Sequence, residues 1–376
     1  MSVKSQFFKL NEEDFDSYLQ DLKESSNSIH LLDGKFFFNQ SLDVTNQVIE
    51  LNTKIVRLDC LIDSFSNFSK KQIIQSFLID EIQSTNKIEN VFSTKHDVLK
   101  AINDLTTSKN VKIISIANAY KLLLEHGGSK INSCLDIRNL YEIVLKDAIE
   151  KEDFPDGMYF RKGPVYITNG IEPIHTGVYG EENINKWMEE FIHCYNSKNE
   201  LYVRMILCHF MFEYIHPYYD GNGRLGRFLF SNGVYSEARS YFSFAIAIAF
   251  LREKSKYYKA FEKATDKYEF GCLNAYVETI LKILLDEVEL LIKQFSTTKE
   301  KLNNVKHDLS LTPSEEKIFK FINEASLFSY FGVTNEEIMK EAHISKRTLM
   351  SSLAKFKRNG ILIDTRIGKY AYHKFK

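Results

Sequence analysis

Twelve consecutive residues, from His216 to Arg227, combine a titratable imidazole, a carboxylate, an amide, three glycines and two arginines. They read His-Pro-Tyr-Tyr-Asp-Gly-Asn-Gly-Arg-Leu-Gly-Arg. An imidazole titrates near neutral pH and can take a proton from a nucleophile. Gly221 and Gly223 permit positive φ and leave backbone N–H groups uncovered. Where a helix begins at such a loop, those N–H groups and the helix dipole bind anions.

The charged residues of the stretch indicate which anion it binds. Arg224 and Arg227 are three residues apart, so they share one face of a following helix. Guanidinium groups bind phosphate through two parallel hydrogen bonds, which suits a polyphosphate. Asp220 stands at the mouth of the same site, and a carboxylate beside phosphates calls for a bridging cation, usually Mg²⁺. The stretch therefore predicts phosphate transfer to a hydroxyl.

The alternative is a solvated turn with two surface arginines, and so many groups in twelve residues argue against it. Neither a P-loop nor a Rossmann fingerprint fits, because both follow a strand. Here an apolar helical segment precedes the loop (201–215), and another follows it (228–235). Because 228 and 229 are apolar, we expect the two arginines to point outward from the second helix.

The stretch resembles the signature of the Fic family, His-Pro-Phe-x-Asp/Glu-Gly-Asn-Gly-Arg-x-x-Arg, and departs from it only at Tyr218. Fic proteins are mostly adenylyltransferases, which move AMP from ATP to a Ser, Thr or Tyr hydroxyl of a target protein. The resemblance implies that His216 is the general base and Asp220 holds Mg²⁺. It also implies that the ATP phosphates are held by a set of loop and helix residues: Gly221, Asn222, Gly223, Arg224 and Arg227, the last reaching the γ-phosphate.

A second segment matches a shorter family pattern. Thr85-Asn86-Lys87-Ile88-Glu89-Asn90 is similar to the Ser/Thr-x-x-x-Glu-Gly/Asn motif of an inhibitory helix in many Fic proteins. In the family this Glu pairs with the second arginine of the signature and blocks productive binding of the γ-phosphate. The resemblance therefore implies that Glu89 pairs with Arg227 and inhibits the enzyme.

Residues 158–178 are rich in Gly and Pro, and they follow a long helical region. Val165-Tyr166-Ile167 is a strand candidate, and Asn169-Gly170 predicts a hairpin turn. Fic proteins have a β-hairpin flap at this place, and its edge holds the target segment as an added strand. The resemblance implies that the target docks here. His175 is either a substrate contact or, as we favour, a polar loop residue.

Composition indicates a mostly α-helical globular protein of 376 residues with only five prolines. Its net charge of −1 provides no overall attraction to nucleic acid or membrane. The longest apolar run, 242–251, is about half a membrane span. The five cysteines show no CxxC spacing, which favours reduced thiols and a cytoplasmic protein: Cys60, Cys134, Cys194, Cys208 and Cys272. His209 is read as a core histidine, with a metal site as the weaker alternative.

Patterning divides the chain into an N-terminal helical region with the inhibitory helix (1–110), a catalytic core (111–295), a linker (296–310) and a C-terminal domain (311–376). The fold class we expect is mostly α: a Fic-type helical core with a β-hairpin flap, plus a winged helix-turn-helix domain at the C-terminus.

The C-terminal domain is predicted from two capping boxes, at Thr312 and Thr334, and a third helix that starts at Ser345. Two short strands around Gly368 complete a pattern that resembles a winged helix. Residues 345–370 are mainly basic through these side chains: Lys346, Arg347, Lys355, Lys357, Arg358, Arg366 and Lys369. Duplex DNA and a protein partner both fit such a surface.

We expect an auto-inhibited cytoplasmic protein adenylyltransferase that uses ATP and Mg²⁺. One alternative is removal of AMP from a modified protein, and another is a nucleotide-sensing DNA-binding regulator. The sequence leaves a homodimer open.

Overall fold

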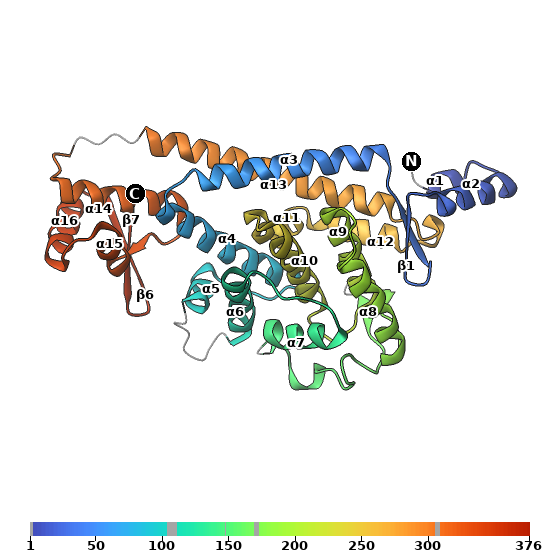
Figure 1. Cartoon of the computed structure of the whole chain (residues 1–376). Coiled ribbons are helices and arrows are strands. Elements are labelled where there is room, and N and C mark those ends of the chain that lie inside the picture. Colours follow the sequence, from blue (N-terminus) through green and yellow to red (C-terminus); the bar gives the residue numbers. More distant parts are fainter. Residues whose placement is uncertain (1–2, 104–110, 147, 169–172, 305–308) are drawn as a thin grey trace.

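A computed structural model describes residues 3–103, 111–146, 148–168, 173–304 and 309–376 (Figure 1). Within these ranges the chain is mostly α-helical, as predicted, with three small antiparallel sheets. No helix in them is long and apolar enough to cross a membrane. The predicted domain boundaries stay predictions.

The N-terminal region contains five helices and one hairpin in its described part: α1 (Val3–Phe7), α2 (Glu12–Glu24), β1 (Ser28–Leu31), β2 (Phe36–Asn39), α3 (Leu42–Asp63), α4 (Asn67–Ile88) and α5 (Lys95–Ile102). The hairpin was not predicted, although the Asp33-Gly34 turn between apolar residues is a strong hairpin signal. The strands pair from Ser28 with Asn39 to Leu31 with Phe36. A capping box formed by Thr94 and Asp97 starts α5.

The central region holds the candidate site. Its described elements are α6 (Val111–His126), α7 (Cys134–Leu145), η1 (Lys151–Asp153), β3 (Tyr166–Thr168), β4 (Pro173–Thr176), α8 (Glu181–Tyr195), α9 (Leu201–Ile215), α10 (Asn222–Ala238), η2 (Tyr241–Ala245), α11 (Ile246–Arg252), α12 (Lys254–Ala264), η3 (Lys267–Glu269) and α13 (Asn274–Asn303). Almost every residue of α9 is buried, because this helix is apolar on all sides and lies in the middle of the core.

Helices α3 and α13 lie along one edge of the molecule (Figure 1). The buried face of α3 is a stripe of apolar side chains at helical spacing, which includes Val48, Leu51, Ile55, Leu58 and Ile62. Helix α13 continues to Asn303, so the first part of the segment 296–310, predicted to be a linker, is helical. Residues 305–308 of that linker lie outside the described ranges.

Strands β3 and β4 pair antiparallel, with Tyr166 opposite Thr176 and Ile167 opposite His175. The predicted turn at Asn169-Gly170 lies outside the described residues. Whether this pair serves as a flap for a target stays a prediction.

The C-terminal unit comprises α14 (Pro313–Phe328), β5 (Val333–Thr334), α15 (Asn335–Ala342), α16 (Lys346–Arg358), β6 (Leu362–Ile367) and β7 (Tyr370–Phe375). Both predicted capping boxes are formed. The strands follow the order β5-β7-β6, and β5 was not predicted because it is two residues long. The winged-helix assignment stays a prediction.

Helix α4 runs from the C-terminal unit toward α10 (Figure 1). Phe68, near its start, packs into the hydrophobic core of the C-terminal unit. Ser66 and Ser69 donate their hydroxyl hydrogens to Glu324 of α14, at 2.6 and 2.7 Å. Glu324 is 1% exposed, so a buried carboxylate from a distant part of the sequence completes the first turn of α4.

Glu324→Ala should lower the free energy of unfolding by about 1.5–3 kcal/mol, because it removes hydrogen bonds to a charged group and leaves two hydroxyls without an acceptor. Urea denaturation measures the loss, and amide exchange should accelerate in the first turn of α4. Glu336→Ala is the control, since Glu336 is exposed on the same unit and makes no side-chain hydrogen bond within the described residues. Equal stability of the two variants would contradict the assignment.

Candidate active site

His216 ends helix α9 in the left-handed conformation, with φ of 53°, and its N–H donates to Phe212 O at 2.9 Å. Its Nδ1 lies 3.2 Å from Glu213 O. Because a carbonyl only accepts, we assign the ring proton to Nδ1, which leaves the Nε2 lone pair free. Burial lowers the pKa of His216 to about 4. The imidazole is therefore a neutral base at neutral pH.

The loop after His216 opens onto the N-terminus of α10. Gly221 takes φ of 86°, and no side chain caps the helix there. The first-turn N–H groups therefore remain open to an anion. Asp220 lies at the mouth, where its Oδ1 accepts from Gly221 N at 2.6 Å and its Oδ2 accepts from Arg224 Nη2 at 3.0 Å.

The side chain of Asn222 is bonded within the loop, and a role of this residue in holding a phosphate stays a prediction. It is 1% exposed, its Oδ1 accepts from Tyr218 N at 2.9 Å, and its Nδ2 donates to Tyr218 O at 2.7 Å. The side-chain amide thus makes the pair of hydrogen bonds to Tyr218 that a backbone amide could make, and it ties the two ends of the loop between α9 and α10 together. In this structure it shapes the anion site through the backbone.

Tyr218 is fully buried and stacks on Tyr141, with ring centroids 3.8 Å apart and an interplanar angle of 16°. Its hydroxyl has no hydrogen-bond partner among the described residues. A phenylalanine would make the same stack without burying a polar atom. This explains in physical terms why an aromatic ring is needed at this position and a hydroxyl is not.

The prediction that the two arginines point outward is wrong. Arg224 is 3% exposed and Arg227 is 1% exposed. The C-terminal end of α4 covers this face of α10, a long-range contact that the sequence of α10 alone does not reveal.

Arg227 is held by the last two turns of α4. Its Nε donates to Thr85 Oγ1 at 2.8 Å, and its Nη2 donates to Thr85 O at 3.1 Å and to Glu89 Oε1 at 2.7 Å. Burial lowers the pKa of Arg227, but Glu89, Tyr257 and Glu213 together raise it by more, so the guanidinium stays charged. The contact predicted between Glu89 and Arg227 is present, and its inhibitory role stays a prediction.

Glu89 also lies against the start of α10. A Cβ placed on Gly223 would be 2.2 Å from Glu89 Oε1, so only glycine leaves room for this carboxylate. Burial raises the pKa of Glu89, but Arg227 and then Arg224 lower it by more, and the net pKa lies below its usual value. An ionised carboxylate therefore lies where an anion would enter.

The inner face of α4 continues this contact toward the core. Glu81, two turns before Glu89, is fully buried and accepts from Ala247 N at 2.9 Å and Ile248 N at 3.1 Å, at the start of α11. Burial raises the pKa of Glu81 to about 7. Sequence reasoning missed Glu81, although a carboxylate four residues before Thr85 lies on the same helix face.

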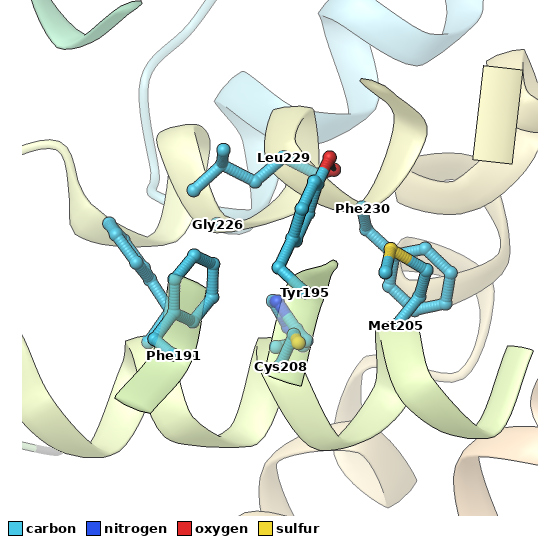
Figure 2. A pocket seen from close by; sticks show the side chains of 9 residues that line it. Phe191, Tyr195, Met205, Cys208, Gly226, Leu229 and Phe230 are labelled. Carbon is cyan, nitrogen blue, oxygen red and sulfur yellow. Dashed lines mark hydrogen bonds between the residues drawn. The ribbon is translucent and has the colours of Figure 1, made fainter. Parts of the chain in front are cut away.

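Close packing of α9 against α10 brings His216 and the arginines together. A Cβ on Gly226 would lie 2.6 Å from Glu213 Oε1 and 3.2 Å from Phe212 Cδ1. Figure 2 shows Gly226 facing the side chains that fill the space between α8, α9 and α10. The gap that remains among them is apolar and has no room for a water molecule, so it is a packing feature and not a nucleotide site.

Within the described ranges, no three His, Cys, Asp or Glu side chains are grouped to hold a metal ion. His209 is a core residue, with its Nε2 2.8 Å from Tyr257 Oη, as we favoured over a metal site. The single half-exposed carboxylate of Asp220 still suits Mg²⁺, which keeps several water ligands and takes the rest from substrate phosphates.

The segment before and within the β3–β4 hairpin contacts the end of α9. His175 lies in strand β4, so the prediction of a loop residue is wrong. Its Nε2 lies 2.7 Å from Tyr214 O, so this histidine has a structural partner in the chain. Arg161, which sequence reasoning missed, is fully buried beside His216. No periodicity or motif marks it, because it lies in an irregular segment.

Comparisons with known proteins identify a family for part of the chain. Residues 133–232 match the model of the Fic/DOC family. A protein adenylyltransferase Fic from Drosophila virilis is 31% identical over 99 residues, which are 23% of this chain and 19% of that protein. A Fic family protein from Desulfovibrio desulfuricans G20 has a similar structure, with a TM-score of 0.57 and 18% identity over 90% of this chain and 97% of that chain. At this identity the likeness shows the fold.

Tyr218→Phe should raise the free energy of unfolding by about 1–3 kcal/mol, because it removes a buried hydroxyl that has no partner. Thermal and urea denaturation measure the gain. Tyr141→Phe is the matched control, since its hydroxyl donates to Asp220 O at 3.3 Å and its loss should not stabilise the protein. A destabilised Tyr218→Phe variant would mean that the hydroxyl is satisfied.

Proposed function

We propose that this chain, a Fic-family protein through its residues 133–232, is a protein adenylyltransferase that moves AMP from ATP to a hydroxyl of a target protein and is inhibited by Glu89. One observation carries the proposal. A neutral base, an open helix N-terminus and two buried arginines meet at one loop, and a carboxylate of α4 occupies the second arginine.

The chemistry assigned to this chain is in-line displacement at the α-phosphorus of ATP. The target hydroxyl loses its proton to Nε2 of His216, and its oxygen forms the new bond to phosphorus. The bond between the α-phosphorus and the bridging oxygen breaks, and pyrophosphate leaves. A positioned general base contributes about 10²–10⁴-fold to such a reaction.

The phosphates would be held by the first-turn N–H groups of α10 and by Arg224 and Arg227. Backbone N–H groups and guanidinium groups that are already in place stabilise charge as it develops on the transferring and leaving groups. Mg²⁺ bound at Asp220 would supply further neutralisation of the phosphate charge. Asn222 supports this site by closing the loop.

Inhibition would follow from competition for Arg227. A charge-assisted Glu–Arg hydrogen bond contributes about 1.5–3 kcal/mol, or on the order of ten- to a hundredfold in a competing equilibrium. Arg227 also donates to the hydroxyl and the carbonyl of Thr85, so the γ-phosphate would have to displace Glu89 from a guanidinium that Thr85 holds in place. Glu89 therefore affects both the affinity for ATP and the placement of its phosphates.

The target would dock as an added strand along residues 158–178, with main-chain hydrogen bonds and little dependence on sequence. Tyr166 of β3 is 61% exposed at this hairpin and is available to a docked segment. The C-terminal unit would be a winged helix that contacts either DNA or a protein. Two cations of its basic stretch are already paired, Lys355 with Glu315 and Lys357 with Asp364, which reduces the charge left for DNA.

Glu89→Gly should label itself or proteins in an extract when given ATP labelled at the α-phosphate and Mg²⁺, while wild type labels them weakly. Glu89→Gly/His216→Ala should lose this labelling, because the base is absent. Transfer by the double variant within threefold of Glu89→Gly would exclude His216 as the base. The AMP-removal alternative would be favoured by two results together: Glu89→Gly gives no labelling, and it no longer releases AMP from a modified protein, whereas wild type does.

The pH profile tests the protonation state of His216. The pKa of His216 is about 4 with Glu89 present, and Glu89 raises it, so its removal lowers the pKa further. Since the base acts when neutral, kcat/KM of Glu89→Gly should be level from pH 8 to about 5.5 and should fall only at about pH 4 or below. Initial rates over this range, with folding followed by circular dichroism, measure the profile. A midpoint at or above pH 6 would show that the imidazole is not desolvated.

A further inference from the structure

Arg161 is a buried cation that the proposed chemistry does not use. It is 0% exposed and has no carboxylate partner among the described residues. Its guanidinium donates to three backbone carbonyls: Nε to His216 O at 2.9 Å, Nη1 to Gly163 O at 2.5 Å and Nη2 to Ile215 O at 3.4 Å. Its own N–H donates to Pro217 O at 3.1 Å.

Two of these carbonyls belong to the end of α9. The last carbonyls of a helix lack intrahelical partners and carry the negative end of the helix dipole. A guanidinium is the one side chain that reaches several of them at once while remaining charged. Burial lowers the pKa of Arg161 to about 10, so it is still protonated at neutral pH. Burying such a charge is unfavourable, and the three carbonyls offset that cost.

The same guanidinium contacts the hairpin segment. Gly163 lies just before β3, and Gly177 lies just after β4. A Cβ on Gly177 would be 2.5 Å from Arg161 Nη2 and 3.1 Å from His216 Cβ. Val178 N donates to Ile215 O at 3.0 Å. Both ends of the hairpin and the backbone of His216 therefore meet at Arg161.

We propose that Arg161 is a positioning residue that fixes the left-handed backbone of His216 and the two ends of the β3–β4 hairpin in one register. This inference rests on the proposed function, since it concerns how the base meets the hydroxyl of a docked target. Arg161 acts through His216 and the hairpin and touches no reacting atom. Errors of about 1 Å in such a register reduce rates on the order of a hundredfold.

The test compares Arg161→Lys and Arg161→Met in the Glu89→Gly background, where transfer is measurable. Arg204 provides matched controls. It is also a buried arginine, at 4% exposure, and it bonds a backbone carbonyl, Ser197 O, and Glu237 at the far end of α9. Arg204→Lys and Arg204→Met therefore report the general effect of removing a buried guanidinium.

In Arg161→Met, kcat should fall at least about fiftyfold relative to the background, with the affinity for ATP unchanged within threefold. Arg161→Lys keeps the charge but reaches fewer carbonyls, so its kcat should lie between that of the Glu89→Gly background and that of Arg161→Met. The Arg204 variants should show the same loss of thermal stability with a much smaller loss of kcat. A purely structural role predicts that kcat follows stability in both series, and that result would overturn the inference.

Amide exchange gives a readout that does not depend on activity. In Arg161→Met the amides of His216, Gly177 and Val178 should exchange faster, because the guanidinium no longer holds the carbonyls of Ile215 and His216 and the adjoining end of the hairpin. The Arg204 variants should leave these amides protected. Inactivity of the Glu89→Gly background would count against the proposed function alone, whereas unchanged exchange in Arg161→Met would refute the positioning role.

Discussion

The burial of the Arg227 guanidinium is the constraint on which the site depends. A charge that is 1% exposed needs a complete set of hydrogen-bond acceptors, because an unpaired buried charge is strongly destabilising. Thr85 and Glu89 provide them here, and both come from one helix. In the proposed mechanism, a polyphosphate that binds productively would have to supply the same interactions. Glu89 and the phosphates would then compete for one buried cation.

Other buried polar groups maintain the geometry around that cation. Glu81 anchors α4 on the start of α11, and Asn222 closes the loop by copying a backbone partner. Gly223 and Gly226 let carboxylates and helices approach where any side chain would collide. In the proposed mechanism the side chains of Glu81 and Asn222 bind no substrate. Together with the two glycines they set the distances between α4, α9 and α10, and these distances fix the positions of His216, Arg224 and Arg227.

Local patterns predicted most of the helices and the catalytic loop. Helix α9 begins and ends with the apolar helical segment predicted at 201–215, and the capping boxes at Thr312 and Thr334 formed as expected. Contacts between distant segments were harder to predict. Glu89 and Arg227 are 138 residues apart, and the pair was expected only because a family pattern suggested it. Arg161 has no local signal, since the carbonyls that it binds become neighbours only in the folded protein.

The cap of α4 has a consequence for how the protein is made. Ser66 is the N-cap of this helix, and its hydroxyl donates a hydrogen bond to Glu324, which lies 258 residues later in the chain. At translation rates of about 5–20 residues per second, on the order of 10 to 50 s pass between the synthesis of these two residues. From the synthesis of Arg227 until that of Glu324, the nascent chain already contains Thr85, Glu89 and Arg227, but the first turn of α4 lacks its carboxylate. Helix α4, which holds Arg227 through Thr85 and Glu89, therefore gains the carboxylate at its first turn only after the C-terminal unit has been made and has folded against it.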